Sequence, residues 1–202
     1  MYRKAISHLK QADESLGQLI HKVGPCRLTM QTEGTHFGYV TRSIVYQQLS
    51  GKAAATIFSR VLALYPKQIL TPARVMKTSH ATLRAAGLSN RKAQYVVELA
   101  ARTHSGELAV ESLHELSDEA VIETLVKVRG IGRWTAQMVL MFRLGRPDVL
   151  PELDLGVQKA VQKMRRMRTL PTPEKLQKIG AVWAPYRTVA SWYLWRSLEL
   201  PE

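Results

Sequence analysis

The sequence predicts an all-α fold, and three observations support that prediction. Apolar residues recur at helical spacing along most of the chain, and residues typical of helix starts follow one another at short intervals. No stretch of useful length alternates apolar and polar residues as a half-buried strand would. A chain of 202 residues suits one large domain or two small lobes that share a core. We expect about ten or more short helices.

The first helix is expected to end at Gly24–Pro25. The apolar residues before this pair fall on one face of a single continuous helix, which a glycine and a proline together stop. Later helices should begin at Ser or Thr residues, because a side-chain oxygen at the N-cap accepts a hydrogen bond from a free backbone amide. The expected N-caps are Thr35, Ser50, Thr71, Ser89, Ser117 and Thr172. A last helix carries Val189, Trp192, Tyr193 and Trp195.

The charge of the chain favours a polyanionic partner. Twenty-nine Lys and Arg residues against sixteen Asp and Glu residues give a formal net charge of +13. The segments 124–147 and 155–173 each contain basic residues and no acidic one. A protein that is merely soluble and basic would spread its charge, so this concentration indicates a nucleic-acid-binding surface.

Several classes of protein are excluded by composition. The single cysteine, Cys26, rules out a disulfide framework and any cysteine-based zinc or iron–sulfur site. The six histidines are scattered and form no HExxH motif, so a transition-metal enzyme is not expected. No apolar run approaches the ~20 residues of a membrane span, and the charged start does not resemble a signal peptide. We therefore expect no membrane partner.

The stretch VRGIGRWTA, residues 128–136, predicts a tight turn between two helices that together span about residues 118–144. Gly130 and Gly132 permit positive φ and close approach of another backbone. The free N–H groups of the turn and of the following helix start would then form an anion site, beside Arg129 and Arg133. A plain packing corner is the alternative for Gly-x-Gly alone. The apolar helices on both sides and the acid-free surroundings favour phosphate binding.

The segment LVKVRGIGRWTA, followed by LGRPDVLPELDLGVQKA, resembles the helix–hairpin–helix DNA glycosylases. The resemblance is to their alkylated-base branch, the 3-methyladenine DNA glycosylase II type. Three further segments agree: RSIVYQQLSGKAAATIF, AGLSNRKAQYV and WAPYRTVASWYLW. The resemblance implies two helical lobes flanking a cleft. One lobe is continuous, from 37 to 146, and ends with the hairpin helices, and the other joins residues 1–36 to 147–202.

Asp154 is the candidate catalytic residue. Its residue type and position predict an N-cap, and the resemblance places the essential aspartate of the family there. Cleavage of an N-glycosidic bond passes through an oxocarbenium-like sugar, so a fixed carboxylate can stabilise the positive charge and orient water. Asp148 and Glu152 are the alternatives. Asp148 follows Pro147 in an expected loop, and Glu152 does not match the motif of the family.

Two features determine the type of reaction that we expect: the leaving group, and Trp134, the residue after Arg133. An alkylated purine is already cationic and leaves without a strong acid, so one carboxylate can suffice where ordinary glycosidases need two. In the related endonuclease III type, the position of Trp134 holds a lysine that forms a Schiff base and cuts the strand. Tryptophan has no amine, so we expect a monofunctional glycosylase without a lyase step.

The resemblance also implies a base pocket and a DNA-contacting surface. The expected pocket residues are Trp134, Trp195, Phe37, Tyr39 and Met138. An indole face near a cationic base adds about 1–2 kcal/mol of cation–π attraction. Gln48 is expected to enter the base stack when the target base is flipped out. The residues expected to contact DNA are Gln47, Gln48, Ser89, Lys92, Arg129, Gly130, Ile131, Gly132, Arg133 and Thr135.

The hairpin of this family often holds a sodium or potassium ion through main-chain carbonyls, and the matching residues are Val126, Val128 and Ile131. We expect no other cofactor, and neither an Fe–S cluster nor zinc. The expected partner is double-stranded DNA, bound by a monomer in the cytoplasm and nucleoid, or in the nucleus of a eukaryote.

The hypothesis is hydrolytic excision of alkylated bases, chiefly 3-methyladenine and also 7-methylguanine, from duplex DNA at the start of base excision repair. One alternative is a non-catalytic DNA-binding module. The other is a glycosylase for other damaged bases, whose neutral leaving groups would need an acid that the sequence does not supply.

Overall fold

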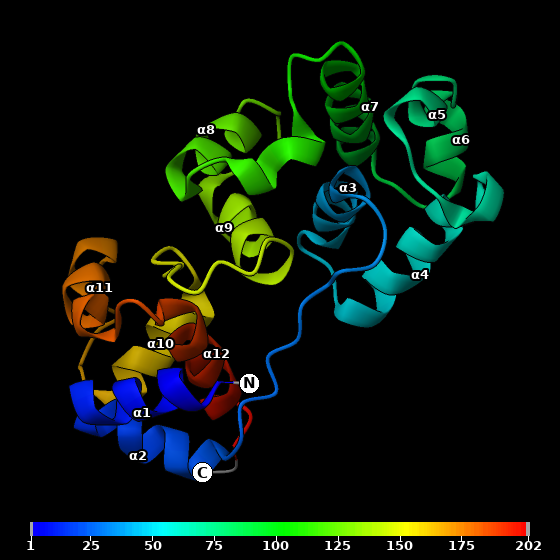
Figure 1. Cartoon of the computed structure of the whole chain (residues 1–202). Helices are drawn as coiled ribbons and strands as arrows, with labels where there is room; N and C mark the ends of the chain where they lie inside the picture. The colour runs from blue at the N-terminus through cyan, green and yellow to red at the C-terminus, as the bar shows by residue number, and fades with distance from the viewer. Residues whose placement is uncertain (1, 201–202) are drawn as a thin grey trace. The chain divides into compact units, whose positions relative to one another are not determined.

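The computed structural model describes residues 2–200 and is built from helices (Figure 1). Within these residues there are twelve α-helices, three short 3₁₀ helices and no strand, which confirms the all-α prediction. The α-helices are α1 (Arg3–Ala12), α2 (Glu14–Val23), α3 (His36–Tyr46), α4 (Gly51–Ala63), α5 (Pro72–Met76), α6 (His80–Ala85), α7 (Asn90–His104), α8 (Asp118–Val126), α9 (Arg133–Phe142), α10 (Leu155–Met164), α11 (Pro173–Gly180) and α12 (Arg187–Ser197). The 3₁₀ helices are Pro66–Gln68, Val110–Glu115 and Ala181–Trp183.

The predicted helix starts are confirmed. Thr35 Oγ1 accepts a hydrogen bond from the backbone N of Gly38 at 3.0 Å, and Ser89 Oγ accepts one from Lys92 N at 3.2 Å. At the other expected positions the side-chain oxygen likewise accepts a hydrogen bond from the backbone N three residues later. These positions are Ser50, Thr71, Ser117 and Thr172. A cap of this kind needs only local sequence, which is why it could be predicted.

The N-terminal segment forms two helices rather than the single one predicted. Asp13 leaves the helical conformation, with φ −147° and ψ 104°, and its Oδ1 caps α2 by accepting from Leu16 N at 3.1 Å. The carboxylate is buried, and Trp183 Nε1 donates to its Oδ2 at 2.8 Å while Arg165 pairs with the same oxygen. These distant partners stabilise a break that the local apolar spacing does not reveal.

The chain divides into two compact units, residues 31–144 and residues 1–30 with 145–202. The segment 31–36 belongs to the continuous unit and residues 145–146 belong to the other one, whereas the predicted boundaries, 37 and 146, placed each in the opposite lobe. Arg143 explains the placement of 31–36, because its guanidinium donates to the carbonyls of Gln31, Glu33 and Gly34 at 2.6, 2.8 and 2.5 Å. The backbone N of Gln31 also donates to Phe142 O at 2.8 Å, which ties the segment to the end of α9.

In the unit 31–144, α7 is the central helix. The helices α3, α5 and α6 all pack against it, α8 packs on α9, and α9 also contacts α3 (Figure 1). Four residues on one side of α7 are fully buried: Ala93, Val96, Leu99 and Ala100. The hairpin between α8 and α9 also lies against α7, through Tyr95 at Gly130 and Glu98 at Arg129.

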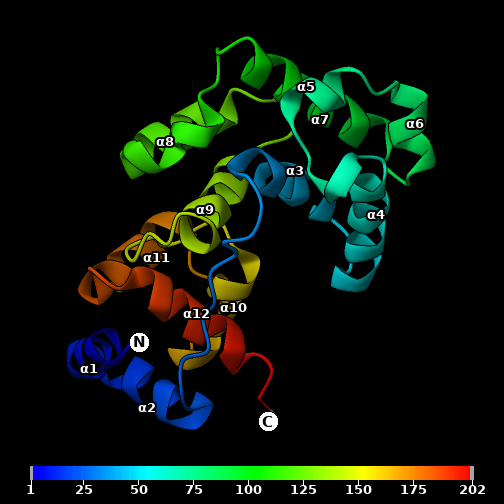
Figure 2. The same ribbon diagram turned by 45° about the vertical axis from the view of Figure 1, so that its right-hand side comes forward.

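In the other unit, α12 packs against α2 and α10 (Figure 2), and α1 packs on α2. The fully buried Leu9, Leu16, Tyr193 and Leu194 form its core. Within the part of the chain that the structure describes, no helix is both long and apolar enough to cross a membrane.

Candidate functional site

The carboxylate of Asp154 is fixed by two donors. Its Oδ1 accepts hydrogen bonds from the backbone N of Val157 and from Nε1 of Trp195, both at 2.8 Å. The first bond makes Asp154 the N-cap of α10, as predicted, and the second comes from α12 of the same unit. Two donors on one oxygen hold the group in one orientation at the positive end of a helix. Trp195, predicted as a wall of the base pocket, therefore orients the predicted catalytic group.

Gly156 allows the indole of Trp195 to approach the carboxylate. A Cβ atom at this position would lie 3.0 Å from Asp154 Oδ1 and 3.0 Å from Trp195 Cδ1. Such contacts are too tight for well-packed atoms, so a larger residue would separate the two side chains. Sequence reasoning missed Gly156, and its place two residues after Asp154 in PELDLG is the signal that could have identified it.

The two alternative carboxylates have other surroundings. Asp148 binds Arg187 through both oxygens, at 2.7 and 2.8 Å, and accepts from the backbone N of Arg187 at the start of α12. Burial raises the pKa of Asp148, but the hydrogen bonds and positive charge of Arg187 outweigh burial and lower that pKa below its ordinary value. Glu152 is buried, and its backbone carbonyl accepts from Gln158 Nε2 at 2.8 Å. Asp148 is thus committed to the anchoring of α12.

The hairpin turn between α8 and α9 uses its two glycines differently. Gly130 has φ +83°, and a Cβ atom there would lie 2.2 Å from the ring of Tyr95, so the fold itself requires glycine. Gly132 is the N-cap of α9, with φ −95° and ψ 172°, and a Cβ atom there would meet nothing within 4 Å. Packing within the protein therefore does not explain Gly132, whereas a ligand approaching the start of α9 would.

The arginines of the hairpin have acidic partners. Arg129 Nε lies 2.6 Å from Glu98 Oε2, and Arg133 Nη1 lies 3.0 Å from Glu119 Oε1. The hydrogen bond to Glu98 and its negative charge raise the pKa of Arg129. The hairpin is therefore less positive than its own acid-free segment predicts, because the acids come from α7 and from the first turn of α8.

Three polar residues predicted to contact DNA bind the protein itself. Gln47 Nε2 donates to Gly130 O at 2.8 Å and to Thr135 Oγ1 at 3.2 Å. Lys92 Nζ donates to two backbone carbonyls, and Ser89 caps α7. Gln48 differs from these three, because its side chain is exposed and its φ is +55°.

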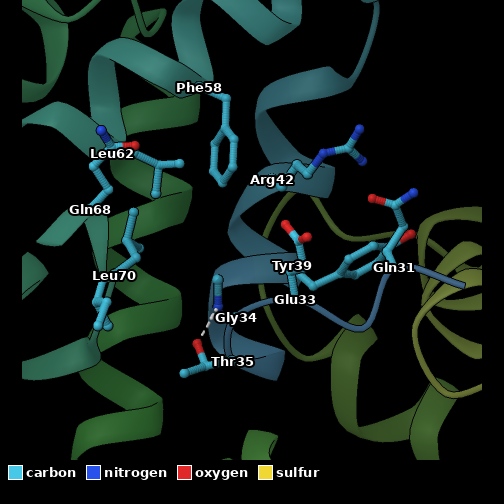
Figure 3. Close-up of a pocket in the computed structure, with 12 residues that line it drawn as sticks. Gln31, Glu33, Gly34, Thr35, Tyr39, Arg42, Phe58, Leu62, Gln68 and Leu70 are labelled. Carbon is cyan, nitrogen blue, oxygen red and sulfur yellow. Dashed lines mark hydrogen bonds between the residues drawn. The ribbon is translucent and has the colours of Figure 1, made fainter.

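The predicted pocket residues differ in exposure. Trp134 is 39% exposed and Met138 is half-buried, so both can meet a ligand. Phe37 has no exposed surface and packs in the core, where it cannot touch a base. Tyr39 is 8% exposed and lines a cavity of about 320 Å³ within the unit 31–144. Figure 3 shows Tyr39 on α3 and Phe58 projecting from α4 into this cavity.

The turn offers neutral carbonyl oxygens near the end of α8. Val126 is the last residue of that helix, and Val128 O accepts from the backbone N of Ile131 at 3.1 Å. A carbonyl has two lone pairs, so this bond leaves Val128 a second acceptor position. Among residues 2–200, no group of three or more His, Cys, Asp or Glu residues could hold a metal ion.

Comparison with known proteins places the chain in a family. The model for HhH-GPD superfamily base excision DNA repair proteins matches residues 41–185, which is most of the chain. The chain belongs to this family. Among HhH-GPD relatives, DNA-3-methyladenine glycosylase 1 of Schizosaccharomyces pombe is 35% identical over 202 residues, which cover 98% of this chain and 89% of the relative. The alkylbase DNA glycosidase-like protein mag2 of the same yeast is 31% identical, with 98% and 95% covered.

Solved structures agree with this assignment to the HhH-GPD family and with the all-α fold. The 3-methyladenine DNA glycosylase of Schizosaccharomyces pombe in complex with abasic DNA matches with a TM-score of 0.88 and 35% identity, over 98% of this chain and 97% of that one. The DNA-3-methyladenine glycosidase of Bacillus halodurans matches with a TM-score of 0.82 and 37% identity, over 95% and 87%. The resemblance that the hairpin and PELDLG motifs predicted is confirmed.

Proposed function

We propose that this HhH-GPD protein is a monofunctional DNA glycosylase that hydrolyses the N-glycosidic bond of alkylated bases in duplex DNA. Its main substrate is 3-methyladenine, with 7-methylguanine as a second one, and it acts as a monomer wherever the cell keeps its DNA. The observation that carries the proposal is the carboxylate of Asp154, whose Oδ1 is held by Val157 N and Trp195 Nε1. High similarity to proteins named as 3-methyladenine glycosylases supports it.

In the proposed reaction, the electron pair of the bond between C1′ and the base nitrogen passes to the base. An alkylated purine is cationic, so this electron pair neutralises it and no general acid is needed. Asp154 stabilises the positive sugar and accepts the proton of the water that adds to C1′. Trp134 supplies no amine for a Schiff base, so the strand stays intact.

The hairpin is proposed to bind a DNA phosphate. The start of α9 provides backbone amides that suit a phosphate, and a Cβ atom at Gly132 would meet no atom within 4 Å. We propose that the carbonyls of Val126, Val128 and Ile131 would hold a sodium or potassium ion, because neutral oxygens suit such a cation. Such an ion would add positive charge beside the phosphate when bound.

The test is release of free base from methylated duplex DNA by the wild type and by Asp154→Asn. We expect Asp154→Asn to lose excision while its affinity for the duplex is kept or increased, because removing the carboxylate's charge removes the catalyst and one repulsion of the phosphates. Asp148→Asn is the matched control, since the same change there should affect stability instead. Excision by Asp154→Asn at the wild-type rate, or strand nicking without later alkali or heat, would contradict the proposal.

A further inference from the structure

Gln48 is exposed in a backbone conformation that non-glycine residues rarely adopt. It lies between the end of α3 and Ser50, the N-cap of α4, with φ +55°. Glutamine gains nothing from this conformation by itself, so the surrounding structure must impose it. The neighbours of Gln48 show how this is done.

Lys92 fixes the backbone before Gln48. Its ammonium donates to Val45 O and to Gln47 O, both at 2.7 Å, and so links α7 to the last turn of α3. Carbonyls at a helix C-terminus have no partner within the helix, and a cation there is favourable. The contact is partly buried, and desolvation lowers the pKa of Lys92. An ammonium desolvated in this way is suited to holding backbone rather than to meeting a phosphate in water.

Gln47 joins the same backbone to the hairpin. While its carbonyl accepts from Lys92, its side-chain Nε2 donates to Gly130 O at 2.8 Å and to Thr135 Oγ1 at 3.2 Å. Both acceptors lie where the hairpin turn meets α9. The position of Gln48 is therefore coupled to the proposed phosphate-binding turn through one side chain.

One face of α7 supports both segments. Lys92, Tyr95 and Glu98 are spaced three residues apart and so lie on the same side of the helix. Lys92 holds the backbone of Gln47, the ring of Tyr95 lies against Gly130, and Glu98 binds both Nε and the backbone N of Arg129. The two loops thus share a single rigid support.

We infer that Lys92 and Gln47 are positioning residues that hold Gln48 at a fixed place relative to the hairpin. This inference rests on the proposed function. When the hairpin binds the backbone of DNA, Gln48 is already oriented to fill the gap left by the flipped base. A loop ordered beforehand loses no conformational freedom at the moment of flipping, which lowers the barrier to that step. Lys92 and Gln47 act through Gln48 and do not touch the DNA.

The test compares Lys92→Met, which removes the ammonium but keeps the length, with Lys92→Arg, which keeps the donors. Excision is measured in single turnover on a methylated strand that is fully paired, and on the same strand with the lesion in an unpaired bubble. Fluorescence of a 2-aminopurine beside the lesion reports flipping directly. A thermal melt of each variant checks folding, and Gln47→Leu, which removes both bonds to the hairpin, is the second variant.

We expect Lys92→Met and Gln47→Leu to lose about tenfold or more in rate and in flipping signal on paired DNA. They should recover in the bubble, where the base is already unstacked, and Lys92→Arg should stay close to the wild type. Equal losses on the two substrates, or a weaker salt dependence of binding for Lys92→Met, would overturn the inference in favour of a folding role or a phosphate contact. Because fluorescence needs no excision, a wild type that flips but releases no base would contradict the proposed function alone.

Discussion

The two glycines of the hairpin should respond in opposite ways to alanine, because only one of them is required by the fold. At Gly130, with φ +83°, an alanine would cost roughly 1–2 kcal/mol for the left-handed backbone. Its Cβ atom would also come within 2.2 Å of the Tyr95 ring, which adds about 1–3 kcal/mol of overpacking. We expect Gly130→Ala to lower the free energy of unfolding by about 2–5 kcal/mol.

At Gly132 the backbone suits any residue and no atom lies within 4 Å of an added Cβ. Alanine makes the unfolded chain less flexible, which stabilises the Gly132→Ala variant by about 0.4–1 kcal/mol. Alanine is also a poorer N-cap than glycine, which costs about 0.5 kcal/mol, so the free energy of unfolding should hardly change. The methyl group would, however, stand in front of the amides of α9. Loss of one hydrogen bond to a phosphate, about 1.5–3 kcal/mol, predicts a Kd for duplex DNA that is about ten- to a hundredfold higher.

Urea unfolding followed by circular dichroism gives the stability of each variant, and fluorescence anisotropy with a labelled duplex gives its affinity. Gly106→Ala measures the backbone cost without the overpacking cost that is added at Gly130. Gly106 also has a positive φ, +81°, but an added Cβ atom there would meet no atom within 4 Å. The reasoning is wrong if Gly132→Ala unfolds as easily as Gly130→Ala, or if Gly132→Ala binds the duplex as tightly as the wild type.

Two further variants test the surroundings of the candidate catalytic carboxylate. Trp195→Phe removes one of the two donors to Asp154 Oδ1, so single-turnover excision should fall by about tenfold or more while duplex affinity is kept. Asp148→Asn should destabilise the protein at neutral pH, since it breaks the pair with Arg187. Because the folded pKa of Asp148 is depressed, its contribution is present above its unfolded pKa of about 3.9 and is lost as pH falls through the folded value. Unfolding curves of wild type and Asp148→Asn should therefore converge in acid, and a constant gap would refute this assignment.

The features that the sequence could predict are those whose partners lie close by in the chain. A cap such as Ser89 accepts from an amide three residues ahead, and Asp154 caps α10 in the same way. The break at Asp13 could not be predicted, because Trp183 and Arg165, which satisfy its carboxylate, lie more than a hundred residues away. Without those partners, nothing in the local sequence indicates that the helix should break at this aspartate.

The same limit explains why the intramolecular partners of polar residues near the motifs could not be predicted. Lys92 and Gln47 are polar, and each stands in a segment that matches the family. Only the fold shows that the partners of Lys92 are carbonyls 45 and 47 residues away and that Gln47 donates across 83 residues to Gly130. A residue type that can bind a phosphate can equally bind a carbonyl, and burial decides between the two.

The ion pairs of the two hairpin arginines affect the energetics of DNA binding. Glu98 and Glu119 lie outside the acid-free segment 124–147, yet they pair with Arg129 and Arg133. A phosphate that approaches either guanidinium must share it with a carboxylate, so each arginine contributes less attraction than a cation without such a partner. Gly132, the N-cap of α9, has no side chain that could compete with a phosphate for the amides of the first turn. Recognition of the backbone of DNA should therefore depend more on these amides, and less on salt, than the net charge of +13 suggests.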